Sequence, residues 1–310
     1  MDIEQLQTFA VAADLLSFTR ASKSRQLSQP AVSLQIRDLE EHFGIALFER
    51  NGRQLSLTPA GMRLREYVGR ILAETVAAQD ELRSMAGQAA GGILHLGATD
   101  TIGNYLLPRL LGIFRAQAPA VRTSIRIGLA TEIARILAER EIDCGLIEQD
   151  LSPRNAKDLE LVPFADDSVV LVVSADHPWS ERSEIQPSEL FSAALLTRQP
   201  GSPMRALIFQ HLAAAGIDPE QLDIQMQLTH TETLKQAIKA GLGVGFVSAY
   251  AVAEELAART LRTVQIQGVN IHRRLWLALP AAGFIPERVR VFHRFLLESP
   301  ALGSVLTRQG

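Results

Sequence analysis

The chain has one cysteine, Cys144, among 310 residues. An intrachain disulfide is therefore excluded, and so is a zinc site built from several cysteines. Cys144 lies in the apolar run from Ile142 to Ile147, where a buried and unreactive thiol is the usual interpretation. The seven histidines show no metal-ligand spacing, and no Ser/His/Asp order stands out. We therefore predict no metal, no cofactor and no enzymatic activity.

Long hydrophobic runs and a leader segment are missing as well. The longest apolar stretch, Val169 to Val173, is far shorter than the roughly 20 residues of a membrane-spanning helix. Residues 1–4 lack the basic and apolar parts of a signal peptide. We therefore expect a cytoplasmic protein without a membrane partner. Its 310 residues, 47% of them hydrophobic, suffice for about two domains with separate cores.

The chain as a whole has no excess of positive charge, because its formal net charge is -3. Residues 15–65 differ, since this segment holds eight basic residues and four acidic ones. The basic residues are Arg20, Lys23, Arg25, Arg37, Arg50, Arg53, Arg63 and Arg65, and the acidic residues are Asp38, Glu40, Glu41 and Glu49. Such a local excess is either a solvated face or, together with a fitting motif, a phosphate-binding surface.

The N-terminal part of the chain shows the periodicity of helices. Apolar residues recur three and four positions apart from Ile3 to Ala13, as one buried helix face requires. A second short helix opens at Thr19, and a third has Ser28 as its N-cap and ends near Gly44. Two short apolar segments flank the Asn-Gly pair at 51–52, which is a strong hairpin signal. Residues 1–58 therefore predict an all-α winged helix-turn-helix domain.

A long helix is predicted next, over residues 59–86. Its inner positions alternate spacings of four and three, which is the repeat of a coiled-coil seam. These positions are Leu64, Val68, Ile71, Thr75, Ala78, Leu82 and Met85. We interpret this linker helix as pairing with a second copy of itself, and packing against its own domain is the alternative. Residues 87–92 are rich in glycine and alanine and predict a hinge.

From residue 93 onward, strand-like and helix-like segments alternate. The order over residues 93–147 is βαβαβ, which indicates a parallel sheet covered by helices. Residues 161–173 predict two further strands that lead into a second unit, and the last elements return to complete the first. We expect an α/β domain with lobe I at 93–162 and 268–310 and lobe II at 163–267. Ligands of open α/β sheets bind at strand ends, so a cleft between the lobes is the expected site.

Several motifs in the N-terminal part carry a resemblance to a known family. They are Phe18-Thr19-Arg20-Ala21-Ser22, Leu27-Ser28-Gln29-Pro30-Ala31-Val32-Ser33, Leu47-Phe48-Glu49-Arg50 and Leu57-Thr58-Pro59-Ala60-Gly61. The sequence resembles the LysR-type transcriptional regulators. This resemblance implies a winged-helix domain, a dimerising linker helix and a two-lobed effector domain similar to type 2 periplasmic binding proteins. It also implies homotetramers, operator DNA and RNA polymerase as partners, and control by a small molecule.

Carried over to this sequence, the resemblance places the recognition helix at residues 29–37. Gln29, Ser33 and Gln35 can read base edges in the major groove, and Pro30 can contact a thymine methyl group. Contacts to the DNA backbone are predicted for Thr19, Ser22 and Arg37, and contacts from the wing for Arg50 and Arg53. For each of these residues the alternative is an ordinary solvated side chain.

The effector site is predicted from hydroxyl and amide side chains near strand ends and helix starts, and, for Arg198 and Ser202, from the resemblance of residues 198–205 to a loop of the family. The candidates are Thr99, Thr101, Thr131, Gln149, Arg198, Ser202 and Thr231. Free N–H groups at a helix N-terminus favour an anion, so we expect an oxyanion or an acidic metabolite. Helix capping alone is the alternative role of the threonines. The sequence leaves the identity of the effector, the target genes and the direction of regulation open.

Three other classes of protein compete with this interpretation. A solute-transport protein would share the two lobes but not the N-terminal domain. An enzyme would need a cofactor motif, and its nearest candidate, residues 241–245, lacks the glycine of the dinucleotide fingerprint because Phe246 stands there. A constitutive DNA-binding protein without ligand control is the third alternative, and ligand-dependent melting would separate it from a sensor.

Overall fold

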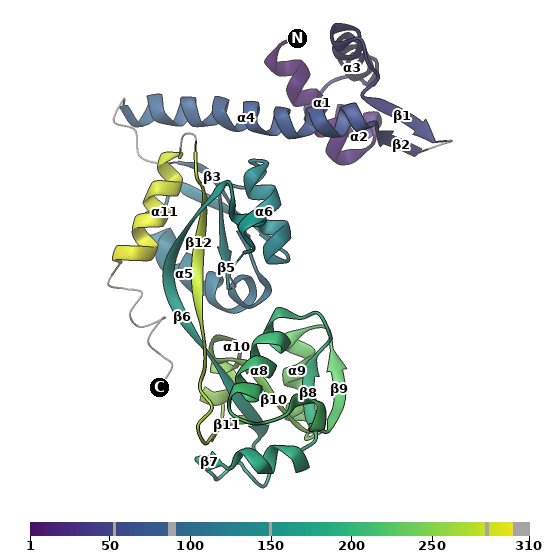
Figure 1. Ribbon diagram of the computed structural model, residues 1–310. Helices are drawn as coiled ribbons and strands as arrows, with labels where there is room; N and C mark the ends of the chain where they lie inside the picture. The colour runs from purple at the N-terminus through teal and green to yellow at the C-terminus, as the bar shows by residue number, and fades with distance from the viewer. Residues whose placement is uncertain (52–53, 86–90, 149–150, 283–284, 300–310) are drawn as a thin grey trace.

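The computed structural model describes residues 1–51, 54–85, 91–148, 151–282 and 285–299. Its N-terminal domain consists of α1 (Ile3–Leu15), α2 (Phe18–Arg25), α3 (Gln29–Phe43) and the hairpin of β1 (Phe48–Asn51) and β2 (Gln54–Leu57). Ser28 accepts a hydrogen bond from the Ala31 N–H as the N-cap of α3, and Gly44 ends this helix at φ 65°. Both predicted helix signals are therefore confirmed, and Figure 1 shows the hairpin as the wing beside α2.

The wing is tied to the recognition helix by one carboxylate. Glu40 of α3 accepts hydrogen bonds from the backbone N–H groups of Leu47 (2.7 Å) and Phe48 (3.1 Å). The Phe48 ring packs edge-on against Phe9 and Phe18, with centroids 5.6 and 5.2 Å apart. The hairpin consequently has a fixed orientation relative to α3, which a DNA-reading surface requires.

Helix α4 (Pro59–Met85) follows, and its first half belongs to the N-terminal core. Val68 is 0% exposed, and Leu64 packs against the same cluster. The prediction that Leu64 and Val68 face a second copy was therefore wrong, because α1 covers this side of the helix. Three other large side chains of α4 are exposed, namely Tyr67, Ile71 and Leu82, and Leu82 is 66% accessible.

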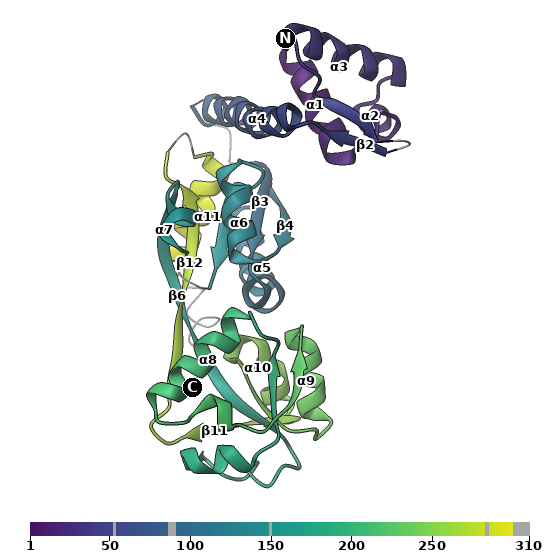
Figure 2. The ribbon, with the colours of Figure 1, turned by 45° about the vertical axis from the view of Figure 1, so that its right-hand side comes forward.

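The remaining chain forms a two-lobed α/β domain below α4 (Figures 1 and 2). Its strands are β3 (Gly92–Ala98), β4 (Val121–Ile127), β5 (Cys144–Ile147), β6 (Leu159–Ser174), β7 (Glu184–Ile185), β8 (Leu195–Arg198), β9 (Ile224–Leu228), β10 (Val244–Ser248), β11 (Leu261–Ile266) and β12 (Ile271–Pro280). Its helices are the π-helix η1 (Ile102–Leu106), α5 (Leu107–Gln117), α6 (Ala130–Ala138), α7 (Pro153–Ala156), α8 (Pro203–Ala214), α9 (Thr231–Lys239), α10 (Ala249–Ala257) and α11 (Glu287–Glu298), with short 3-10 helices at Pro187–Ser192 and Pro219–Gln221.

One continuous sheet runs through both lobes in the order β4-β3-β5-β12-β6-β10-β8-β9. Strands β4, β3 and β5 are parallel, as the βαβαβ pattern predicted. Strand β6 pairs with β12 along its first part and with β10 and β11 along its second part. The lobes are therefore joined by β6 and β12, which cross between them as unbroken strands (Figure 1).

The prediction of two strands over residues 161–173 was wrong, because β6 is a single strand of 16 residues. Pro163 lies within this strand, although proline cannot donate to a strand ladder. In the structure Pro163 pairs with Trp276 beside a register shift of β12. A bulge of this kind tolerates the missing N–H.

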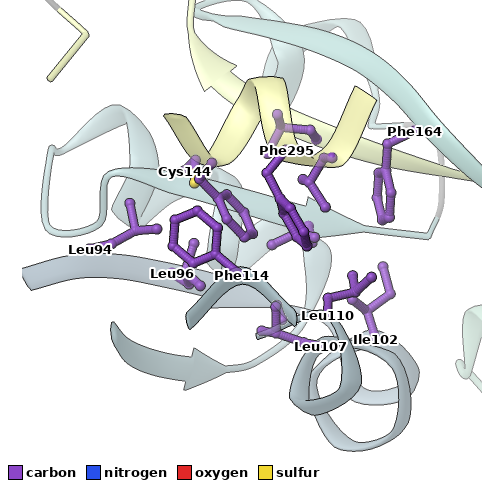
Figure 3. Packing of buried hydrophobic residues seen from close by; sticks show 14 of the residues in the cluster. Leu94, Leu96, Ile102, Leu107, Leu110, Phe114, Cys144, Phe164 and Phe295 are labelled. Atoms are coloured by element: carbon purple, nitrogen blue, oxygen red, sulfur yellow. The ribbon is translucent and has the colours of Figure 1, made fainter. Parts of the chain in front are cut away.

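Each lobe has its own core. The lobe I core gathers side chains from η1, α5, the sheet and α11 around Phe114, Phe292 and Phe295 (Figure 3). Cys144 is part of this core, and burial raises the pKa of its thiol well above the ordinary value. The burial predicted for Cys144 is confirmed. In the described part of the chain, no helix is long and apolar enough to cross a membrane.

The glycine-rich segment at 241–245 is a tight turn between α9 and β10. Gly241 has φ 75° and Gly243 has φ 157°, both in the region that favours glycine. A Cβ atom on Gly243 would lie 2.2 Å from the Ala194 carbonyl oxygen. This conformation explains the glycines without any cofactor. The sequence did not predict α10 or β11, which lie after this turn.

Candidate functional site

The outer face of α3 is the candidate DNA-reading surface. Val32, Ile36 and Leu39 anchor the helix in the core, while Gln29 and Pro30 at its start are exposed. Ser33 is half-buried on the same outward side, one turn after Gln29. The predicted base-reading side chains are thus presented by a helix whose opposite face holds it in the domain.

The predicted backbone contacts have different surroundings. Thr19, Arg37 and Arg50 are exposed, whereas Ser22 is buried and its hydroxyl donates to the Thr19 carbonyl oxygen (3.0 Å). The Ser22 hydroxyl is thus already bonded within α2, and its contact with DNA stays a prediction. Gln35 is half-buried at the flank of α3, and Arg53 lies outside the described residues.

A cavity of about 530 Å³ lies between the two lobes. Lobe I contributes Thr99, Thr101 and the start of α6, and lobe II contributes Arg198 and Ser202. The other lining residues are Asp100, Gly128, Leu129, Ala130, Glu148, Asp166, Pro203, Met204, Leu207, His272, Arg273, Arg274 and Trp276. Four of the predicted effector residues therefore meet around one cavity, although they are far apart in the sequence.

Of the other three predicted effector residues, Thr131 and Thr231 do not line this cavity. Thr131 is exposed in the first turn of α6, so the structure does not place it in the site. Thr231 lies behind Arg198 and accepts a hydrogen bond from its Nη1 (2.8 Å). Gln149 lies outside the described residues.

A buried arginine organises the lobe I wall of the cavity. Arg273 of β12, with a side chain 7% exposed, donates through Nε to Asp167 (2.8 Å) and has Nη1 3.2 Å from Glu148. Its Nη2 donates to the Thr101 hydroxyl (3.2 Å), and the Thr99 hydroxyl donates to Glu148 (2.5 Å). The two threonines are therefore fixed by an ion network and not by helix capping.

Burial and charge act against each other in this network. Burial raises the pKa of Asp167, although Arg273 and the Ser248 hydroxyl both lower it. Burial lowers the pKa of Arg273, but Glu148 and Asp167 outweigh this effect and hold the pKa above its usual value. Because Arg273 faces two carboxylates, its own charge is fully compensated before any ligand enters.

Arg198 is the cation that reaches the cavity from lobe II. Its Nη2 donates to the Thr229 carbonyl oxygen (2.6 Å), and its Nη1 lies 3.6 Å from the Asp100 carboxylate of lobe I. The Thr231 hydroxyl also donates to Asp100 (3.3 Å). The Nε of Arg198 is buried and has no hydrogen-bond partner in the described part of the chain. Arg198 thus connects the lobes, and one of its N–H groups has no acceptor among the described residues.

The sequence analysis missed Arg273, Asp167 and Glu148. One signal was present, because two adjacent acidic residues at 166–167 and two adjacent basic residues at 273–274 interrupt otherwise apolar segments. In the sheet these pairs stand opposite one another, with Arg273 facing Asp167 and Arg274 facing Asp166. Like charges inside a strand indicate a partner of opposite charge on the neighbouring strand.

The role of Thr101 can be tested by replacing it with valine. The Thr101→Val variant should lose about 1–3 kcal/mol in free energy of unfolding, since one Arg273 N–H is left buried without an acceptor. Thr131→Val is the matched control and should stay within about 0.5 kcal/mol, because Thr131 is exposed. Urea unfolding of both variants measures the difference. Equal stability of the two variants would contradict the ion network described here.

Comparisons with known proteins agree with this architecture. The family described as "Bacterial regulatory helix-turn-helix protein, lysR family" matches residues 3–62, and "LysR substrate binding domain" matches residues 87–301. The probable RuBisCO transcriptional regulator of Trichormus variabilis is 35% identical over 291 residues, covering 93% of this chain and 84% of the relative.

Two solved structures extend the comparison. Full-length OxyR from Pseudomonas aeruginosa has a TM-score of 0.76 at 24% identity, covering 100% of this chain and 98% of that chain. The regulatory domain of Synechocystis PCC6803 CcmR, solved in complex with 2-PG, has a TM-score of 0.59 at 25% identity. It covers 70% of this chain and 99% of that chain.

A winged helix-turn-helix joined by a long helix to a two-lobed α/β domain is the architecture of a DNA-binding transcriptional regulator. The chain belongs to the LysR family of bacterial transcriptional regulators. Proteins of this family regulate transcription, and the chain is accordingly not an enzyme.

Proposed function

We propose that this regulator binds a small anion in the interlobe cavity and that the bound anion alters its affinity for operator DNA. Arg198 carries the proposal, because its buried Nε faces no acceptor in the described part of the chain and its side chain lines the cavity. A guanidinium N–H forms strong hydrogen bonds with oxyanions. The 2-PG complex of the CcmR regulatory domain supports an effector site in this kind of domain.

The anion has to compete with a carboxylate for Arg198. Asp100 lies 3.6 Å from the guanidinium and reaches it across the gap between the lobes. Thr101 and Ser202 offer further hydroxyl groups to a ligand on either side of the cavity. An anion held by both lobes would replace the contact between Asp100 and Arg198 as the link that joins them.

A thermal-shift screen tests the proposal directly. Inorganic phosphate, sulfate and 2-PG should each be titrated against the full-length protein, since a ligand at 100 times its Kd stabilises the folded state by about 2.7 kcal/mol. Operator affinity should then change in the presence of the stabilising anion. If no anion raises the melting temperature and none alters operator affinity, the result contradicts the proposed anion and favours the second candidate function, constitutive DNA binding.

Self-association is part of the proposed function. Tyr67, Ile71, Thr75, Ala78 and Leu82 stand at spacings of four, four, three and four along α4, and the largest of them are exposed. This stripe supports a homodimer through paired α4 helices, which we propose assembles into homotetramers. We further propose that the operator-bound protein contacts RNA polymerase, as the family resemblance implies.

The proposed DNA contacts predict two different mutant phenotypes. Gln29→Ala and Ser33→Ala should lower affinity for the operator more than for random DNA, because each removes a base contact worth about 1–3 kcal/mol. Arg50→Ala should weaken binding to both DNAs and make the salt dependence shallower by about one unit. Binding titrations at several salt concentrations measure both effects. Equal losses on both DNAs for Gln29→Ala and Ser33→Ala would assign these residues to backbone contacts.

A further inference from the structure

Residues 139–141 of lobe I lie directly against the DNA-binding domain and α4. Arg65 of α4 lies 3.2 Å from Glu141, and the same guanidinium lies 2.9 Å from Asp14 of α1. The other oxygen of Glu141 accepts a hydrogen bond from Arg126 of β4 (2.7 Å). Two charged groups of the DNA-binding domain and two of lobe I therefore form one chain of ion pairs.

The same segment also meets α4 through its backbone. A Cβ atom on Gly69 would lie 2.9 Å from the Glu139 carbonyl oxygen, which is closer than real Cβ contacts. Glycine is therefore required for this approach of the helix to lobe I. Farther along, a cavity of about 410 Å³ lies between residues 72–79 of α4 and lobe I, and α11 also approaches α4.

Residues 139–141 directly follow the C-terminal end of helix α6, and the other end of this helix lines the effector cavity. Helix α6 spans Ala130–Ala138, and Gly128, Leu129 and Ala130 at its start form part of the cavity wall. The chain then turns through Asp143 into β5, which leads back to the cavity at Glu148. Helix α6 and strand β5 thus both run between the ligand site and the region next to α4. Figures 1 and 2 show α6 beneath α4.

The middle of α6 rests directly on the sheet. A Cβ atom on Gly97 or Gly145 would lie 2.9 or 2.8 Å from the Ile133 side chain, so the helix approaches the backbone of β3 and β5 there. The start of β5 is fixed separately, because Asp143, directly before this strand, accepts hydrogen bonds from Arg288 of α11 (2.9 and 3.2 Å). Helix α6 buries Ala130, Ile133, Ala134, Ile136 and Leu137 along its length, with its closest approach to the sheet at Ile133. A short helix packed in this way moves as one rigid body, since packed interiors deform little.

We propose that α6 is a lever that couples the effector cavity to the DNA-binding domain, with Ile133 as its pivot and the contact of Glu139 and Glu141 with α4 as its output. An effector that moves residues 128–130 shifts residues 139–141 against Arg65 and Gly69. The orientation of the winged helix-turn-helix on lobe I changes with it. This inference rests on the proposed effector function and adds the route by which the signal travels.

The test compares two glycine-to-alanine variants of the full-length protein. Gly69→Ala forces α4 away from Glu139, whereas Gly112→Ala in α5 is a control with open space around the added methyl group. Alanine favours helices over glycine, so both variants should fold. In the wild type and the control, an anion that binds the cavity should change operator affinity about fivefold or more. In Gly69→Ala this change should fall below about twofold, while affinity for the anion is retained.

Glu141→Gln removes the ion pair without adding volume and should reduce the same coupling. Wild-type coupling in Gly69→Ala would overturn the proposal. If inorganic phosphate, sulfate and 2-PG all fail to bind, the proposed effector function fails. The coupling through α6 can still be tested by adding operator DNA and following the effector cavity, because coupling between two sites is reciprocal. Binding of an operator duplex selected in vitro should then alter hydrogen exchange at residues 128–148 in the wild type and in Gly112→Ala. The same alteration in Gly69→Ala, or none in the wild type, would overturn the lever.

Discussion

Replacing Arg198 with glutamine is expected to lower the affinity for the effector anion about 100-fold or more. The variant loses two or more hydrogen bonds from a charged donor, each worth roughly 1.5–3 kcal/mol, and 1.4 kcal/mol corresponds to a tenfold change in Kd. Glutamine keeps part of the packing volume and can still bond to Thr231 or to the Thr229 carbonyl oxygen. Calorimetric titration with 2-PG or inorganic phosphate measures the loss.

Two further variants make this prediction specific. Arg274→Gln is the matched control, because Arg274 lines the same cavity but its side chain is 58% exposed and lies 3.5 Å from Asp166. A surface pair of this kind contributes little, so the loss should stay below about fivefold. Asp100→Asn should strengthen anion binding, since the carboxylate that competes for Arg198 is neutralised. Equal losses in Arg198→Gln and Arg274→Gln would contradict a dedicated role of Arg198.

The second large effect is expected from the α4 stripe. Ile71→Asp combined with Leu82→Asp should yield monomers, because two charges would have to be buried without partners in the paired helices. Operator affinity should fall about 100-fold or more, since a dimer binds two half-sites with the advantage of multivalency. Sedimentation velocity and operator titrations measure the two effects.

Neither position belongs to the N-terminal core, so the DNA-binding domain should remain folded. Gln79→Asp is the control, because it adds a charge at an exposed position of α4 outside the stripe. It should leave the assembly unchanged. A full-length dimer that persists in the double variant would place the main interface elsewhere, most simply between effector domains.

The sequence predicted those features whose signals are local. Ser28 and Gly44 delimit α3 because capping depends on the few residues around a helix end. The seam of α4 was only partly predictable, since Leu64 fits the repeat equally well whether it faces a second copy or its own domain. The contact of α1 with α4 decides between these possibilities, and it is a tertiary feature.

In the effector site, too, residues with local sequence signals were predicted and residues that depend on tertiary contacts were missed. Thr99 and Thr101 were predicted because they stand near a strand end and a helix start, where cavities of α/β sheets form. Arg198 and Ser202 were predicted because residues 198–205 resemble a loop of the family. Arg273 was missed, because its partner Asp167 is 106 positions away and only the register of β12 on β6 brings them together. Thr131 does not line the cavity, and the sequence could not show this, since the direction in which the first turn of α6 presents its side chains depends on how that helix packs.

The crossing strands also determine the order in which the protein can fold during synthesis. Strand β12 lies between β5 and β6 in the sheet, so lobe I lacks a central strand until residues 271–280 have left the ribosome. Nearly 100 residues separate the end of β6 at Ser174 from the start of β12 at Ile271, which takes roughly 5–20 s at about 5–20 residues per second. During this time β5 and one side of β6 are open edges that can pair with other chains. Lobe II can assemble its β10, β8 and β9 ladder earlier, and lobe I closes last although its first strand is made first.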